Sequence, residues 1–100
     1  MEKARPHYRL EEMKADIARL GAAAFTRTAI DGGRAMGLTP AEMLQVIAGL
    51  SGRNLYKSMT TYADPRIWQD VYHAATASGR VAYIKLTQVN DGPVVQFKER

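Results

Sequence analysis

Apolar residues recur at helical spacing through the first half of the chain. Four of them form one face at steps of three and four residues: Leu10, Met13, Ile17 and Leu20. Gly21 follows this face and ends the predicted helix. A second helix is predicted over residues 28–36 and ends at Gly37, although Gly32 and Gly33 inside it each cost about 1 kcal/mol relative to alanine.

A third predicted helix has the clearest start signal in the chain. Thr39 stands at the N-cap position, Pro40 at the first helical position, and Glu42 where a capping box places its acidic residue. Its buried face is predicted to consist of Met43, Ile47 and Leu50. Gly49 and Gly52 mark its end.

After residue 52 the pattern changes to the alternation typical of β-strands. Strands are predicted over residues 55–62, 67–72, 81–89 and 94–98. Their connections are a turn at 63–65, a loop of small residues at 74–79 and a hairpin at 90–93. In the first strand, Tyr56, Ser58, Thr60 and Tyr62 are predicted on one side, and Leu55, Lys57, Met59 and Thr61 on the other.

This order of elements predicts the fold class. A helical N-terminal half followed by a strand-rich C-terminal half is typical of an α+β fold. We expect one domain, residues 1–100, with the helices packed on one face of a mainly antiparallel sheet. The other face of that sheet is expected to be partly free.

The final hairpin gives a more detailed prediction. If Asp91 and Gly92 are its two loop residues, Lys85 lies directly opposite Lys98. The core face then holds Ile84, Leu86, Val95 and Phe97, with Gln88 as a polar exception, and the other face holds Tyr83, Lys85, Thr87, Gln96 and Lys98. Two opposed lysines repel each other. Either they swing apart into solvent, or an anion lies between them.

Composition and charge narrow the class of protein. With 46% hydrophobic and 24% charged residues, the chain is not of a disordered type. Its net charge of +4 is compatible with a polyanionic partner or with a solvated basic surface. No apolar run approaches the roughly 20 residues that span a bilayer, and no apolar segment follows the N-terminal charges, so we expect a cytoplasmic protein.

Several chemistries lack the residues that they require. Cysteine is absent, and His7 and His73 have no second ligand at metal-binding spacing, so no metal or other cofactor is expected and both histidines are predicted at the surface. Neither a phosphate-binding glycine loop nor a Gly-x-Ser-x-Gly elbow occurs. The remaining candidates for chemistry are Lys, Tyr, Gln and Arg residues on the predicted strands. They suit RNA, whose 2′-OH is an attached nucleophile, because they can move protons and stabilise phosphoryl charge.

Two blocks of sequence resemble a known family. Residues 56–62 read Tyr-Lys-Ser-Met-Thr-Thr-Tyr, and residues 67–72 read Ile-Trp-Gln-Asp-Val-Tyr. With Met-Glu-Lys at the start and Phe-Lys-Glu near the end, the chain resembles the MqsR branch of the RelE-like bacterial toxins over its whole length. The resemblance implies a RelE-like fold and an endoribonuclease toxin. Such an mRNA interferase would cleave single-stranded mRNA at GC-containing sites (GCU or GCA), without a metal or the ribosome, and so inhibit translation.

The resemblance also implies a partner. This is an MqsA-like antitoxin, whose zinc-binding N-terminal part binds the toxin and whose helix-turn-helix part binds operator DNA. The pair would thereby regulate its own transcription, with links to biofilm formation and persistence.

The functional residues of the family map onto Lys57, Gln69, Tyr83 and Lys98. Tyr83 is the first choice for proton transfer, and the two lysines would stabilise charge. Further RNA contacts are predicted at Lys85, Met59 and Arg53.

The chain also departs from the family pattern. His73-Ala74 stands where the family often has Arg-Pro, and Asn90 stands where members can carry His. These departures bear on substrate preference and rate more than on the reaction class.

Two other functions remain open at this point. A non-catalytic RNA-binding protein could use the same basic face, with salt-dependent binding and no cleavage. An interaction module could instead offer a sheet edge for strand addition. The enzyme hypothesis predicts that the four mapped side chains converge on one site.

Overall fold

The computed structural model describes residues 1–100, with helices first and strands afterwards. The helices are α1 (Leu10–Leu20), α2 (Arg27–Ala35) and α3 (Pro40–Ala48), with short 3-10 turns at Gly21–Ala24 and Gly52–Asn54. The strands are β1 (Glu2–Lys3), β2 (Leu55–Thr60), β3 (Trp68–Ala75), β4 (Val81–Val89) and β5 (Gly92–Glu99). Strand β1 is the element that the sequence pattern did not predict.

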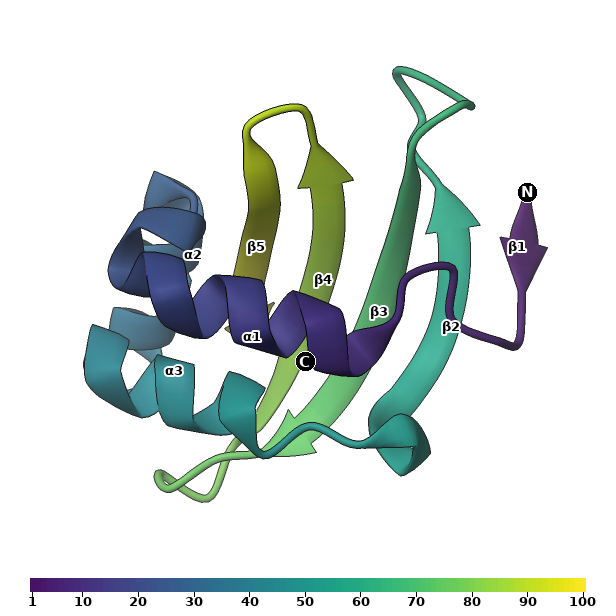
Figure 1. Cartoon of the computed structure of the whole chain (residues 1–100). Helices are drawn as coiled ribbons and strands as arrows, with labels where there is room; N and C mark the ends of the chain where they lie inside the picture. Colours follow the sequence, from purple (N-terminus) through teal and green to yellow (C-terminus); the bar gives the residue numbers. More distant parts are fainter.

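The five strands form one antiparallel sheet in the order β1-β2-β3-β4-β5. All three helices lie on one side of it, and α1 runs across β5, β4 and β3 (Figure 1). The core between the two layers includes Met13, Ile17, Met43, Ile47, Tyr72, Ile84, Leu86, Val95 and Phe97. The predicted α+β class, with helices on one face of the sheet, is therefore confirmed.

The starts of α2 and α3 follow from threonine caps. Thr39 Oγ1 accepts a hydrogen bond from the Glu42 backbone N–H at 3.1 Å, and Glu42 Oε1 accepts one from the Thr39 N–H at 2.9 Å. This is the predicted capping box. Thr26 Oγ1 caps α2 by accepting from the Ala29 N–H at 3.0 Å. The predicted start of α3 is thus confirmed, and the sequence placed α2 within one residue of its observed bounds.

Two glycines let α2 approach its neighbours closely. A Cβ on Gly32 would lie 2.2 Å from the carbonyl oxygen of Phe97, and one on Gly33 would lie 2.2 Å from Sδ of Met43. Both positions therefore lack room for a side chain, which explains why glycines of low helix propensity occur inside a helix. The close approach seats α2 against β5 beside Lys98.

The bounds of the first two long strands differ from the prediction. Strand β2 ends at Thr60, before Tyr62, and β3 continues to Ala75 through residues predicted as a loop. Alanines can continue this strand because Ala74 pairs with the buried Ala82 of β4. The predicted loop of small residues is therefore wrong at residues 74 and 75, which belong to β3.

A bulge in β2 overturns the predicted alternation at Tyr56. The register of β2 against β3 shifts between Leu55 and Lys57. Leu55 packs against the core, whereas Tyr56 stacks on His73, on the side of the sheet away from the helices. Tyr56 therefore does not share a face with the buried Ser58, because the bulge inserts one residue and reverses the alternation before it.

The last hairpin has a different register from the predicted one. Val89 pairs with Gly92, so Asn90 and Asp91 are the loop residues, and Gly92 has a φ of 120° that favours glycine. The shift amounts to two residues in pairing, so the predicted core and open faces are preserved. Lys98, however, lies opposite Tyr83 rather than opposite Lys85. Gln88, the predicted polar exception on the core side, is exposed.

The segment before α1 is tied to the sheet by Asp70. Its buried carboxylate accepts hydrogen bonds from the backbone N–H groups of His7 (2.9 Å) and Tyr8 (2.8 Å) and from Ser58 Oγ (2.6 Å). This segment follows directly after β1, and β1 pairs with β2 through Glu2 and Met59. Asp70 thus helps to hold the N-terminal strand on the edge of the sheet.

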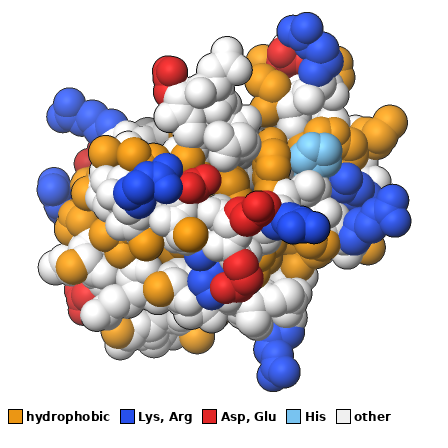
Figure 2. Space-filling model, in the orientation of Figure 1, with side chains coloured by type: hydrophobic (Ala, Val, Ile, Leu, Met, Phe, Trp, Pro, Cys, Tyr) orange, Lys and Arg blue, Asp and Glu red, His pale blue; other side chains and the backbone are white.

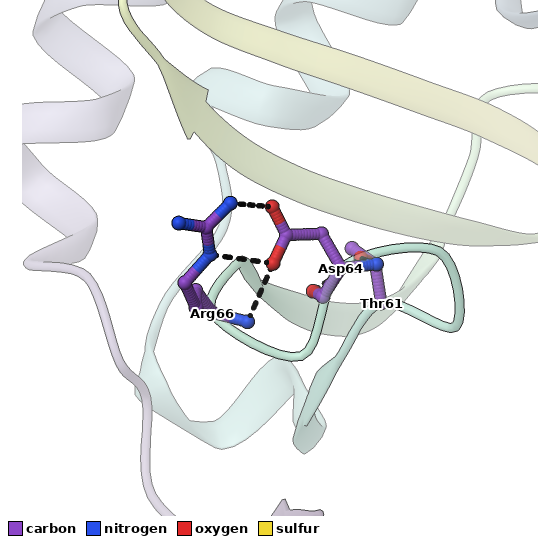
Figure 3. Close-up of polar contacts among 3 residues, drawn as sticks. All are labelled: Thr61, Asp64 and Arg66. Carbon is purple, nitrogen blue, oxygen red and sulfur yellow. Dashed lines mark hydrogen bonds and ion pairs between the residues drawn. The ribbon is translucent and has the colours of Figure 1, made fainter.

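The connection between β2 and β3 has its own polar contacts. Thr61 Oγ1 donates to the carbonyl oxygen of Asp64 at 2.7 Å, and Arg66 binds the Asp64 carboxylate through Nε and Nη2 at 3.0 Å each (Figure 3). Tyr62, in the same connection, is fully exposed. Elsewhere in the chain, none of the three helices has the length and apolar character that a membrane span requires.

Candidate active site

The face of the sheet away from the helices carries two neighbouring rows of side chains. One row crosses four strands and consists of Lys57, Val71, Lys85 and Gln96. The other consists of His73, Tyr83 and Lys98. Because positions two residues apart on a strand are neighbours on one face, these rows place three lysines around one tyrosine.

Tyr83 lies among these lysines. Nζ of Lys98 is 5.3 Å from the centre of its ring, and Nζ of Lys85 is 5.8 Å from it. Burial, and then the charges of Lys98 and Lys57, lower the pKa of Lys85. The Lys85 ammonium group is therefore close enough to those of Lys98 and Lys57 to be repelled by them. A bound anion would relieve this repulsion, so the cluster suits a phosphate group.

Lys57 has a carboxylate partner from the N-terminal strand. Its Nζ donates a hydrogen bond to Oε1 of Glu2. That hydrogen bond raises the pKa of Lys57, and the same contact lowers the pKa of Glu2. Lys57 is thus a firmly charged ammonium group, and an acidic side chain already binds it on the open face.

Gln69 and Met59 extend the site by one further row. They pair with each other across β2 and β3. Gln69 Nε2 donates to Oγ1 of Thr87 at 3.2 Å, and Thr87 is only 7% exposed. This contact fixes the orientation of the Gln69 amide, since the threonine is held in the sheet. Gln69 and Met59 therefore flank Lys57 on the same face.

Arg53 is the predicted site residue that lies apart from the others. It is exposed on the turn Gly52–Asn54, before β2 begins. It lines neither of the hollows beside Tyr83. The structure thus brings together six of the seven predicted residues, and Arg53 is not among them.

Two aromatic residues lie beside Tyr83 although the sequence pattern predicted no role for them. The Tyr56 ring stacks on His73 with centres 4.4 Å apart and planes at 21°. The centre of the Tyr83 ring is 5.3 Å from that of His73 on the other side. His73, predicted at the surface without a role, lies half-buried on this open face, because β3 continues past Tyr72. Extending the predicted strand 67–72 by one residue would have placed His73 on the same face as Gln69.

Two hollows open beside these rows, and Tyr83 and Lys98 are the residues that line both. The first, of about 410 Å³, lies between the start of α2, at Thr28, and strands β4 and β5. The second, of about 450 Å³, also includes Tyr56 and His73. An extended substrate could therefore pass Tyr83 on both sides.

The charge distribution differs on the helical side of the molecule. Figure 2 shows that side, where basic and acidic side chains lie next to one another over its centre. On the open face, in contrast, Lys57, Lys85 and Lys98 lie in two neighbouring rows, and Glu2 pairs with Lys57. No three His, Asp or Glu side chains are grouped so that they could hold a metal ion.

Comparison with known proteins identifies the family. The model of the family described as "Motility quorum-sensing regulator, toxin of MqsA" matches residues 5–99. The chain belongs to this family of MqsR toxins. It is also 44% identical to the mRNA interferase toxin MqsR of Escherichia coli (strain K12), and the match covers 100% of both chains. The resemblance carried by residues 56–62 and 67–72 is therefore confirmed.

In this member of the MqsR family, the open face combines the parts that RNA cleavage needs. Lys57, Lys85 and Lys98 can stabilise negative charge on phosphoryl oxygens. Tyr83, between Lys85 and Lys98, carries a proton that it can transfer. Gln69 can donate or accept a hydrogen bond at the edge of the group.

Proposed function

We propose that this protein is an endoribonuclease toxin that cleaves mRNA on the open face of its sheet. The observation that carries the proposal is the grouping of Lys57, Lys85 and Lys98 around Tyr83. Burial and the charges of Lys98 and Lys57 lower the pKa of Lys85, and a polyanionic substrate would offset the cost of holding its ammonium group there. The relative from Escherichia coli, 44% identical, is named an mRNA interferase toxin, which supports the same activity here.

The proposed reaction uses the ribose 2′-OH as the nucleophile. Its oxygen attacks the adjacent phosphorus, the bond to the 5′-oxygen breaks, and a 2′,3′-cyclic phosphate and a 5′-hydroxyl result. Lys57 and Lys98 stabilise the charge that develops on the phosphoryl oxygens. Tyr83 is the proton-transfer group, and Gln69 and Met59 contact the nucleotide beside the scissile bond. No step in this scheme requires a metal.

The proposed substrate is single-stranded mRNA cut at GC-containing sites, GCU or GCA, independently of the ribosome. Membership of the MqsR family supports this choice. The open face also fits a single strand better than a duplex, because its exposed tyrosine, Tyr56, and its lysines can contact unstacked bases and backbone together. Cleavage of mRNA inhibits translation, and we place the activity in the cytoplasm.

The proposed partner is an antitoxin of the MqsA type. The family description names its members as the toxin of MqsA, which supports the pairing. In this proposal the antitoxin has a zinc-binding part that binds the toxin and a helix-turn-helix part that binds operator DNA. The toxin reaches DNA only through that complex.

One experiment tests the activity and the mechanism together. The purified protein is incubated in EDTA with a defined single-stranded RNA that contains one GCU site, and the fragment ends are mapped. A cut at that site with a 2′,3′-cyclic or 3′-phosphate is expected. Lys57→Ala is the control, because it removes one phosphate-stabilising charge. If the wild type leaves the RNA intact while binding it in a salt-dependent manner, the protein is an RNA-binding protein and the nuclease proposal fails.

A further inference from the structure

His73 lies in the middle of the proposed active site, between two tyrosines. It stands in β3 on the open face and pairs with Tyr83 of β4, which in turn pairs with Lys98 of β5. Tyr56 covers one side of its ring at 4.4 Å, and the Tyr83 ring lies 5.3 Å away on the other. Its imidazole is thus beside the residue proposed to transfer a proton.

The Nε2 atom of His73 is buried and has no hydrogen-bond partner in the protein. Every other buried side-chain nitrogen or oxygen atom in the chain has a hydrogen-bond partner. An imidazole nitrogen in this state costs stability, because it has lost water and gained nothing in return. Such groups are rare, and a site in which a ligand completes the hydrogen bond is one place where they persist.

The groups around the imidazole keep it neutral. The titratable groups that line the hollow with it are Tyr56, Tyr83, Lys98, Glu99 and Arg100. Burial, and then the positive charge of Arg100, lower the pKa of His73 below its ordinary value of 6.5. A neutral imidazole carries one nitrogen that accepts a proton. His73 is therefore available as a base at neutral pH, whereas an ordinary phenol, with a pKa of about 10, keeps its proton there.

We propose that His73 is a catalytic residue of this enzyme and accepts the proton of the ribose 2′-OH, while Tyr83 donates a proton to the leaving 5′-oxygen. This inference rests on the proposed function. The 2′-oxygen bonds to phosphorus as its proton passes to Nε2 of His73. The bond between phosphorus and the 5′-oxygen breaks, and that oxygen takes the phenol proton of Tyr83. The imidazolium then loses its proton and the tyrosinate regains one, which restores the site.

Tyr56 covers one face of the His73 imidazole. This side chain is 55% exposed and stands at the bulge of β2, so it can swing away without disturbing the core. The backbone of His73 is fixed, because its carbonyl oxygen accepts a hydrogen bond from Asn54 Nδ2 at 3.1 Å and its strand lies between two others. In this proposal RNA displaces Tyr56 and reaches an imidazole carried by a fixed strand.

The test is the pH dependence of cleavage by the wild type and by two variants, His73→Phe and His73→Gln. For the wild type, kcat should fall along an acidic limb that lies below pH 6.5, because burial and Arg100 lower the pKa of His73 and protonation removes the base. It should be constant from there to about pH 8. Both variants should lose roughly 100-fold in kcat and should lose the acidic limb of the profile, with little change in KM.

His73→Phe keeps a stacking ring between the two tyrosines, so it separates proton transfer from packing. If this variant keeps the wild-type kcat or the acidic limb, the proposal is overturned. A third variant, Tyr56→Leu, uncovers the imidazole and should raise the pKa of His73, so that the acidic limb moves to higher pH. A limb that does not move also overturns the proposal. If the wild type cuts no RNA at any pH, the proposed function itself fails. If the wild type cuts RNA and the His73 variants cut it equally well, only the role of His73 fails.

Discussion

Lys98 lies directly opposite Tyr83 across β4 and β5, with its ammonium nitrogen 5.3 Å from the centre of the tyrosine ring. In the proposed function, the lysine attracts the substrate phosphate to the side of the ring that carries the phenol hydroxyl. Tyr83→Phe removes only the hydroxyl group and leaves the ring. We expect kcat for RNA cleavage to fall about 100-fold, with stability nearly unchanged. Initial rates on a defined RNA measure this.

The matched control for that variant is Tyr62→Phe. Tyr62 is fully exposed in the connection between β2 and β3, outside the two hollows at Tyr83. Loss of its hydroxyl should leave kcat and KM unchanged. If Tyr83→Phe also retained the wild-type kcat, the phenol would have no part in proton transfer, whatever the role of the lysines.

Glu2 binds the Lys57 ammonium group in this structure and, in the proposed function, competes with RNA for it. Its carboxylate accepts a hydrogen bond from Lys57 Nζ, where a phosphate oxygen would otherwise be held. In Glu2→Gln the charge is gone and the ammonium group is released, so we expect the KM for RNA to decrease severalfold. Glu11→Gln is the control, because Glu11 pairs with Lys14 on α1, on the helical side. An equal decrease in both variants would assign the effect to net charge alone.

Much of the fold was predictable because the local signals agree with the packing. The capping box at Thr39 and the apolar face of α1 each specify an element without knowledge of the rest of the chain. Strand faces were predictable for β4 and β5 for the same reason, since Ile84 and Phe97 alternate with polar neighbours. The register of their hairpin was not, because Asp91-Gly92 and Asn90-Asp91 are both acceptable loops and only the whole sheet selects one.

The candidate site was predictable where it depends on strand alternation and not where the strand is locally irregular. Tyr83 and Lys98 were placed on one face by parity, and a pairing error of two residues left that unchanged. Tyr56 was predicted on the wrong face, because the sequence pattern does not indicate the bulge in β2. The position of His73 on this face was not predicted, because the alanines that follow it are typical of a loop. They are strand residues here because they pair with β4, a non-local contact.

Gly32 sets the distance between α2 and the strand that carries Lys98. An added Cβ would meet the carbonyl oxygen of Phe97 at 2.2 Å, and backbone cannot move aside as a flexible side chain can. We expect Gly32→Ala to destabilise the protein by roughly 3 kcal/mol and to lower the cleavage rate by displacing Lys98. Urea unfolding and initial rates measure the two effects.

Gly52→Ala is the control for that variant, because a Cβ there meets nothing within 4 Å. It should leave stability within about 1 kcal/mol of the wild type. If Gly32→Ala were as stable and active as Gly52→Ala, α2 and β5 would not be as closely packed as the structure has them.

Asp70 holds the N-terminal segment through its buried carboxylate, which accepts the N–H groups of His7 and Tyr8 and the hydroxyl of Ser58. Asp70→Asn keeps the shape but replaces one acceptor oxygen by an NH₂ group, which faces donors. We expect a loss of roughly 3 kcal/mol in the free energy of unfolding, since hydrogen bonds to a buried charge are lost. Because β1 then loosens, Glu2 should also contact Lys57 less often.

Asp64→Asn is the matched control, since Asp64 pairs with an exposed arginine, Arg66, at the surface (Figure 3). Exposed ion pairs contribute little to stability, so its unfolding midpoint in urea should stay close to that of the wild type. Amide hydrogen exchange at Lys3 should accelerate in Asp70→Asn and not in Asp64→Asn. Unchanged exchange in both variants would mean that β1 is held by its pairing with β2 alone, and Asp70 would then have no part in placing Glu2 beside the active site.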